Sequence, residues 1–231
     1  MSSRSIPGIG RYQITRSRRR TLAISVLPDC RVEVVAPMKA AVPAIEAKLT
    51  KRAGWIARQR RIFAAFHADR PKPRFCSGAT HRYLGRQYRL KVTAAKRTSV
   101  KLIGGYFHIT SRSTAPSAVA ALLKRWYRER ATHQFCRRIE PWRGWCASKG
   151  LPEPRVLLRA MPKRWGSAHA TGTILLNPEL VRAPSSCIDY VIIHEICHLK
   201  RPRHDRAFFK ILQQLCPRWQ KAKLRLETLN W

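Results

Sequence analysis

The sequence has no long apolar run and no recognisable export signal. No stretch of about eighteen consecutive apolar residues occurs, which argues against a conventional transmembrane helix. Residues 1–20 are polar and arginine-rich and contain no apolar core of the kind found in secretory signal peptides. We therefore expect a soluble, cytoplasmic protein that does not associate with membranes.

Paired-cysteine motifs are also missing. The 231 residues include seven cysteines, an odd number, and no two of them form a Cys-x-x-Cys pair. Disulfide scaffolds and zinc ribbons are therefore not expected, and reduced thiols agree with a cytosolic protein.

Acidic residues are scarce. There are 12 Asp and Glu against 47 Lys and Arg, which gives a formal net charge of +35 distributed along the whole chain. Such a charge attracts polyanions, and several tryptophans lie among the arginines, where they can stack on bases. No known nucleic-acid-binding motif is present, so the charge predicts nonspecific rather than sequence-specific binding of nucleic acid or another polyanion.

The most informative segment of the chain is a His-Glu-x-x-His motif followed by a third histidine. His194 and His198 are four residues apart, so on a helix both imidazoles can reach one Zn²⁺, and His204 is the natural third ligand. Three protein ligands leave a position open for water, as in catalytic zinc sites. Glu195 lies beside the metal and is predicted to act as the general base that takes a proton from this water.

The residues around the motif favour a helix with a defined end. Residues 190–193 are apolar, and Pro184, Ser185 and Ser186 are start signals. Pro202 has no backbone N–H and disfavours the helical conformation at the preceding residue, so it predicts a helix end that lets the chain return towards the metal.

The same ligand spacing occurs in metzincins, but two of their features are missing here. Arg201 occupies the position of their glycine, and no methionine follows the motif, because the only ones are Met1, Met38 and Met161. Instead, residues 205–216 carry apolar side chains at helical spacing, which predicts a second helix packed behind the first.

Further segments resemble a known family. They are residues 81–86, 164–167 (Arg-Trp-Gly-Ser), 174–177 and 188–195, together with the basic entry at 18–22 and the His-x-x-x-Phe continuation at 204–208. Together they resemble the YgjP-like metallopeptidases, which are related to the WLM and SprT-like zinc proteins. The resemblance covers most of residues 11–226, and Arg-Trp-Gly-Ser is its most discriminating part.

This resemblance implies further site features. Arg164 and Trp165 are expected near the metal, where Arg164 can steady an oxyanion or an anionic substrate and Trp165 can pack. The family commonly continues with Cys and a Ser-rich turn, whereas this chain has Ala-His-Ala-Thr-Gly at 168–172, so we interpret His169 as a surface histidine. In related zinc peptidases an edge strand beside the metal pairs with the substrate, and residues 172–177 are the expected counterpart.

The remaining pattern predicts an α+β fold, with a hairpin-rich N-terminal region containing a helix and a C-terminal zincin-like helical domain with a short sheet. We expect a basic, partly disordered arm (1–20), a β-rich subdomain (21–112) and a zincin-like metallopeptidase domain (113–231). Hairpins are predicted over 21–37 and between 81–93 and 98–110, and helices over 42–66 and from Pro116 towards Gly150. Short strands are predicted at 155–159 and 172–177, and no internal repeat is apparent.

Three functions are compatible with these features. The first is a zinc-dependent peptidase acting on a peptide or protein substrate, with Glu195 as base and His194, His198 and His204 as ligands. The second is a pyrophosphatase that uses the same zinc site to hydrolyse a nucleoside triphosphate. Arginine-rich surroundings are suitable for such an anionic substrate. The third is a basic nucleic-acid-binding protein whose metal is structural, and it leaves Glu195 without a role.

Overall fold

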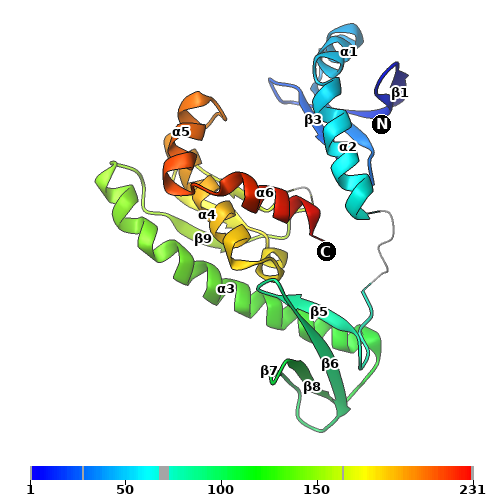
Figure 1. The fold of residues 1–231 in the computed structure, drawn as a ribbon, viewed down its shortest axis with the longest axis vertical. Coiled ribbons are helices and arrows are strands. Elements are labelled where there is room, and N and C mark those ends of the chain that lie inside the picture. Colours follow the sequence, from blue (N-terminus) through cyan, green and yellow to red (C-terminus); the bar gives the residue numbers. More distant parts are fainter. Residues whose placement is uncertain (1, 28, 68–72, 163, 230–231) are drawn as a thin grey trace. The chain divides into compact units, whose positions relative to one another are not determined.

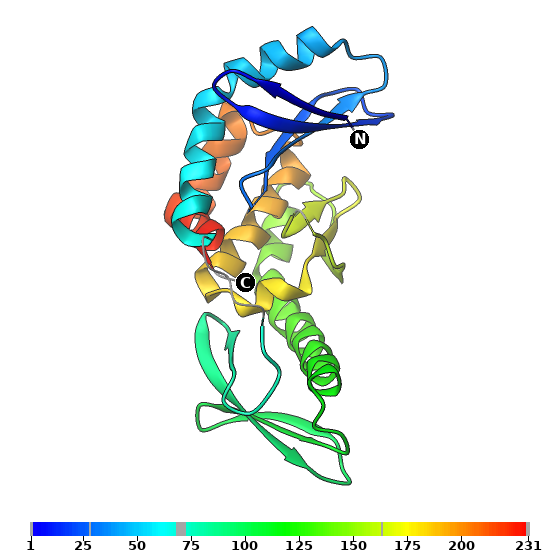
Figure 2. The ribbon, with the colours of Figure 1, turned by 90° about the vertical axis from the view of Figure 1, so that its right-hand side faces the viewer.

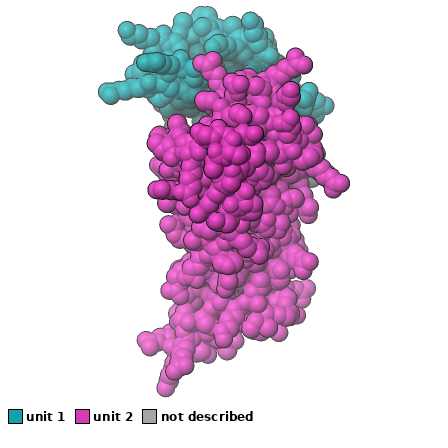
Figure 3. All heavy atoms as spheres, turned by 90° about the vertical axis from the view of Figure 1, so that its left-hand side faces the viewer, with its two compact units in different colours: residues 1–71, 227–231 teal, residues 72–226 magenta. Residues whose placement is uncertain are grey.

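The computed structural model describes residues 2–27, 29–67, 73–162 and 164–229 and confirms a mixed α+β fold (Figure 1). The chain divides into two compact units, residues 1–71 with 227–231, and residues 72–226 (Figure 3). This division falls about forty residues before the boundary expected at 112/113. None of the helices in the described part of the chain combines the length and apolar character needed to cross a bilayer.

The first unit contains a four-stranded sheet. Its strands are β1 (Ser2–Ile6), β2 (Gly10–Ser17), β3 (Ala23–Val26) and β4 (Val32–Pro37), in the order β1-β2-β4-β3. The hairpin expected over 21–37 is the antiparallel pair β3–β4. The expectation of a partly disordered arm at 1–20 needs correction, because β1 and β2 form an antiparallel pair and β2 also pairs in parallel with β4.

Two helices cover this sheet where one was expected. They are α1 (Val42–Lys51) and α2 (Ala53–His67), and they are separated by Arg52, whose backbone departs from helical geometry. Alternate residues of β2 and β4 point inward and meet Ile45, Leu49 and Ile56 of the helices in one buried core. The inward-facing residues of the strands recur at every second position and those of the helices at about every 3.6 positions, and both sets pack in the same core layer.

The second unit begins with a sheet of the same topology. Its strands are β5 (Thr80–Tyr83), β6 (Arg86–Ala94), β7 (Ser99–Ile103) and β8 (Tyr106–Ser111), in the order β5-β6-β8-β7. The single hairpin expected between 81–93 and 98–110 is wrong: each segment is itself an antiparallel hairpin, and β6 and β8 pair in parallel. Both four-stranded sheets thus share one strand order and one pattern of pairing, a repeat that is not visible in the sequence.

The long helix α3 (Pro116–Ser148) connects this sheet to the rest of the unit (Figures 1 and 2). Near its N-terminal end, Trp126 and Tyr127 make edge-to-face contacts with Phe107 of the sheet, and Tyr83 packs edge-on against Trp126. Buried aromatic pairs of this kind add stabilisation beyond the area that they bury. The aromatic cluster therefore anchors the sheet to α3.

A three-stranded sheet precedes the motif helix. It consists of β9 (Arg155–Leu158), β10 (Gly166–Ala168) and β11 (Thr173–Leu176), in the order β10-β11-β9. The two strands expected at 155–159 and 172–177 are present, but the second cannot be the substrate-binding edge, because β11 is paired on both sides. The short strand β10, which was not predicted, is an edge of this sheet.

After the short 3-10 helix η1 (Pro178–Arg182), three helices complete the chain: α4 (Ser185–Lys200), α5 (Arg206–Leu215) and α6 (Trp219–Thr228). Arg138 of α3 forms an ion pair with Asp189 and donates a hydrogen bond of 2.8 Å to Ser185 Oγ. These contacts tie the first turns of α4 to α3.

Candidate metal centre

Helix α4 carries the His-Glu-x-x-His motif and ends where Pro202 predicts. Its last residue is Lys200, and Arg201 is already extended. The residues of α4 that precede the motif are mostly buried, so the helix lies deep in its unit and offers His194 and His198 from neighbouring turns. The chain then turns back, which brings His204 to the same place.

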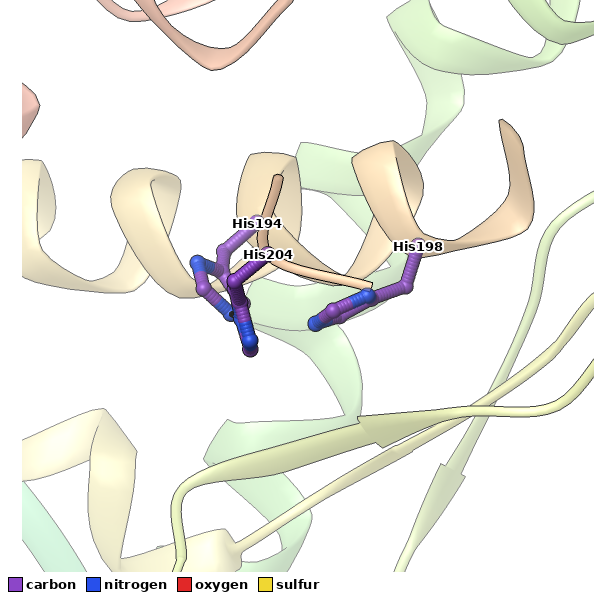
Figure 4. A group of neighbouring side chains, drawn as sticks. All are labelled: His194, His198 and His204. Carbon is purple, nitrogen blue, oxygen red and sulfur yellow. Dashed lines mark hydrogen bonds between the residues drawn. The ribbon is translucent and has the colours of Figure 1, made fainter. Parts of the chain in front are cut away.

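The three histidines gather their rings around one point (Figure 4). One ring nitrogen from each of His194, His198 and His204 lies within 4.8 Å of the other two, and the Nε2 atoms of His194 and His204 are 3.0 Å apart. At the usual Zn–N distance, two tetrahedral ligand atoms are roughly 3.3 Å apart. The His194–His204 pair is therefore close to the separation of two ligands, and His198 offers a third nitrogen near enough to share the same ion.

The protonation state of the three imidazole rings suits a metal ion. Nδ1 of His198 lies 3.1 Å from the carbonyl oxygen of Arg201, which can only accept, so this nitrogen carries the proton and Nε2 keeps its lone pair. Burial lowers the pKa of His198 and His204, and it lowers that of His194 to about 3, with help from the other two histidines. Neutral imidazoles are the form that binds metal ions.

Within the histidine cluster, the buried Nδ1 of His194 has no hydrogen-bond partner among the described residues. With Nε2 of this ring facing His204, the ring is held by packing rather than by a second hydrogen bond. Phe208 supplies much of that packing. Its fully buried ring lies with its centroid 4.7–5.0 Å from all three imidazole centroids.

Helix α5 fixes Phe208 in turn. Asp205 is the N-cap of α5 and accepts a 2.8 Å hydrogen bond from the backbone N–H of Phe208. Phe208 and Leu212 are buried on the inner face of this helix. The predicted second helix is therefore present, and the His-x-x-x-Phe spacing places His204 just before the N-cap of α5 and Phe208 in its first turn.

Glu195 is buried beside this cluster and is not one of its members. Only 6% of the residue is exposed, and burial raises the pKa of its carboxyl group to about 7, although the backbone N–H of Ala168 and the charge of Arg164 both oppose the rise. A carboxyl group with a pKa near neutrality can both take up and release a proton at physiological pH.

Gly166 makes room for this carboxylate. A β-carbon at position 166 would lie 2.6 Å from Oε1 of Glu195 and 2.8 Å from its Cγ. Any other residue in this place of β10 would force the carboxylate or the strand to shift. Gly166 and Ala168 are thus site residues that the sequence reasoning did not single out, although the Arg-Trp-Gly-Ser segment contains one of them.

The other expected site residues have different positions. Arg164 is exposed and acts on Glu195 through its charge. Trp165 is half-buried, and its carbonyl accepts a hydrogen bond from Asn177 N–H. His169 is exposed in the turn between β10 and β11, where its Nδ1 lies 2.9 Å from Thr171 Oγ1, and it is not part of the histidine cluster.

Comparison with known proteins agrees with this geometry. The family model described as YgjP-like, metallopeptidase domain matches residues 20–229, which is nearly the whole chain. None of the curated proteins compared with the chain matches it.

Proposed function

The chain belongs to the YgjP-like metallopeptidase family, and from this premise we propose that it is a zinc-dependent peptidase with Glu195 as general base. His194, His198 and His204 would hold the metal. When bound, zinc would polarise the scissile carbonyl and make water more acidic. The observation that carries the proposal is the placement of Glu195: a buried carboxylate, held by a strand N–H next to three neutral histidines.

Glu195 is suited to moving a proton in both directions. Burial brings its pKa close to 7, so its carboxylate accepts a proton from the attacking water and then gives it to the leaving nitrogen of the peptide. The Ala168 N–H holds the carboxylate in one orientation during both steps. Arg164, exposed but close enough to act on Glu195 electrostatically, is placed to attract an anionic part of the substrate.

Strand β10 offers an extended peptide a place to bind. It pairs with β11 through Trp165 and His169, so in an antiparallel pair the backbone groups of Gly166 and Ala168 face the outer edge. The Glu195 carboxylate accepts a hydrogen bond from the Ala168 N–H. The backbone N–H and C=O of Gly166 therefore remain directed outward, next to the carboxylate. A substrate added as a further strand would therefore run past the proton-transfer group.

The test uses zinc-loaded protein and a pool of denatured proteins, with new peptide ends detected by mass spectrometry. We expect cleavage by the wild type and at least a hundredfold loss in Glu195→Gln, because the amide cannot take up a proton. Glu140→Gln, which changes an exposed carboxylate of α3, is the matched control and should cleave normally.

A parallel incubation with nucleoside triphosphates separates the peptidase from a pyrophosphatase. Pyrophosphate release that depends on Glu195, with no peptide cleavage, would assign the same site to nucleotide hydrolysis and overturn the peptidase proposal. Zinc binding without either activity would leave only the structural-metal hypothesis for this centre.

A further inference from the structure

A second candidate binding site lies within the first unit. A groove of about 440 Å³ is lined by Leu22 and Ile24, beside and within β3, by Lys48 and Lys51 of α1, by Trp55 of α2, and by Arg52 between these two helices. We call it the basic groove. Its volume lies in the range of roughly 300–1,000 Å³ that small-molecule sites occupy.

The groove combines an apolar floor with a cationic rim. Leu22 and Ile24 are partly buried and pack against the core of the unit. Three of its six lining residues are cations and none is acidic. The nearest acidic side chain along α1, Glu46, accepts a hydrogen bond of 2.7 Å from Tyr12 and so is engaged on the sheet side. The three cations repel one another, and a bound anion would relieve this repulsion.

Trp55 adds a flat aromatic surface to the groove. It is 36% exposed, so part of its ring is open to solvent. The exposed cations Arg58 and Arg61 follow at intervals of three residues on α2, so the positive charge continues along the helix beyond the groove. The site is thus one end of a basic stripe rather than an isolated cluster.

The helix that carries Trp55 is anchored to the sheet. Arg60 of α2 donates from Nε to the carbonyl of Cys30 over 3.0 Å and from a terminal nitrogen to the carbonyl of Ile9. Ile56, next to Trp55, is fully buried in the core. The wall of the groove is therefore held in place before any ligand binds, which lowers the entropic cost of binding.

We propose that the basic groove binds single-stranded nucleic acid, with a base stacked on Trp55 and phosphates on Lys48, Lys51 and Arg52. An apolar floor, one exposed aromatic ring and several nearby cations are the features by which proteins hold single strands without reading their sequence. A duplex keeps its bases stacked inside and cannot use Trp55, so the ring favours a single strand over a duplex. This site is independent of the peptidase proposal, because no residue of the metal centre takes part.

The experiment measures the anisotropy of a labelled 20-nucleotide single strand and of the matching duplex as full-length protein is added over a range of salt concentrations. The variants are Trp55→Ala, Trp55→Tyr and the triple variant Lys48→Gln/Lys51→Gln/Arg52→Gln. The matched control is Lys96→Gln/Arg97→Gln/Lys101→Gln, which removes the same charge from exposed positions of the second sheet region. Circular dichroism checks that each variant is folded.

We expect Trp55→Ala to weaken single-strand binding by about fivefold or more, and Trp55→Tyr to retain most of it, because each stacked base contributes measurably to affinity. The triple variant should reduce the slope of log affinity against log salt by about two, at about 0.7 for each phosphate contact. Glu195→Gln should bind like the wild type.

Three results would overturn the proposal. The first is equal weakening by the triple variant and its charge-matched control, which would mean that binding depends on diffuse charge alone. The second is equal affinity of Trp55→Ala and wild type for the single strand. The third is no binding of the single strand at low salt.

Discussion

Gly166 and Glu195 are in contact so close that a β-carbon on Gly166 would lie 2.6 Å from the carboxylate oxygen of Glu195. Real β-carbons do not approach another heavy atom so closely, and Glu195 is buried, so its side chain has little space to retreat. The missing side chain at position 166 therefore sets the position of the proposed general base.

Gly166→Ala should displace the Glu195 carboxylate while leaving the histidines in place. We expect about a hundredfold loss of hydrolytic activity with unchanged zinc content, because small displacements of a reacting group have effects of this size. Gly144→Ala is the control, since a β-carbon there would meet nothing within 4 Å. Equal activity of the two variants would show that the contact is unimportant for the reaction.

Zinc should stabilise the folded protein through the three histidines. Binding to the native state alone adds about 2.7 kcal/mol at a free zinc concentration one hundred times the dissociation constant. Thermal unfolding with zinc and with a chelator should differ in the wild type and in His133→Ala, an exposed histidine of α3, but much less in His204→Ala. Metal analysis of the same samples should give one zinc per chain, lost in His204→Ala. Retention of zinc by that variant would exclude His204 as a ligand.

His81 should make stability sensitive to mild acid. Burial lowers its pKa, and nearby Arg182 adds to the effect, while the hydrogen bond from Nε2 to the Arg74 carbonyl opposes it. The unfolded chain therefore takes up the proton first as pH falls below about 6.5, so His81 reduces stability below that pH and has no such effect above it. Urea unfolding between pH 8 and 5 should show a smaller loss for His81→Gln, which keeps a donor near Arg74. Parallel curves of stability against pH for the wild type and His81→Gln would contradict this prediction. The histidines of the cluster are present in both proteins and so contribute equally to both curves.

The Arg138–Asp189 pair should contribute to the docking of α4 on α3. The Arg138 side chain is only 14% exposed and Asp189 is about half-buried, so Arg138→Ala should lower the free energy of unfolding by about 1–3 kcal/mol. Arg125→Ala breaks an exposed pair on the same helix and should cost less than about 0.5 kcal/mol. Urea unfolding of both variants provides the comparison, and similar values would mean that Arg138 makes no special contribution.

The histidine cluster could be predicted because its geometry is local. His194 and His198 are one helical turn apart, and His204 follows within ten residues after a proline that ends the helix. The surroundings of Glu195 could not be predicted in the same way. Gly166 and Ala168 reach it through the pairing of β10 with β11 and the packing of that sheet on α4, and neither contact has a periodic signature.

The strand pairing shows the same limit. Alternating apolar residues indicated strands at 21–37, 81–93 and 98–110, but the partner of each strand depends on which edges meet in space. β6 turns back on β5 at Gly85 and pairs in parallel with β8, so two short hairpins replaced one long one. Likewise β9, from an earlier part of the chain, pairs with the other side of β11, so that β11 is central and β10 and β9 are the edge strands.

The contact of Ala168 with Glu195 has a consequence for the order in which the chain matures. The three histidines lie within eleven consecutive residues, so a segment that has formed only α4 and the following loop already has its metal-binding groups together. The hydrogen bond from the Ala168 N–H to Glu195 forms only after β10, from an earlier part of the chain, has docked on α4. On the proposed function, a partly folded molecule would therefore gather its zinc-binding groups before its general base is in place, so zinc capture would precede the ability to cleave a peptide.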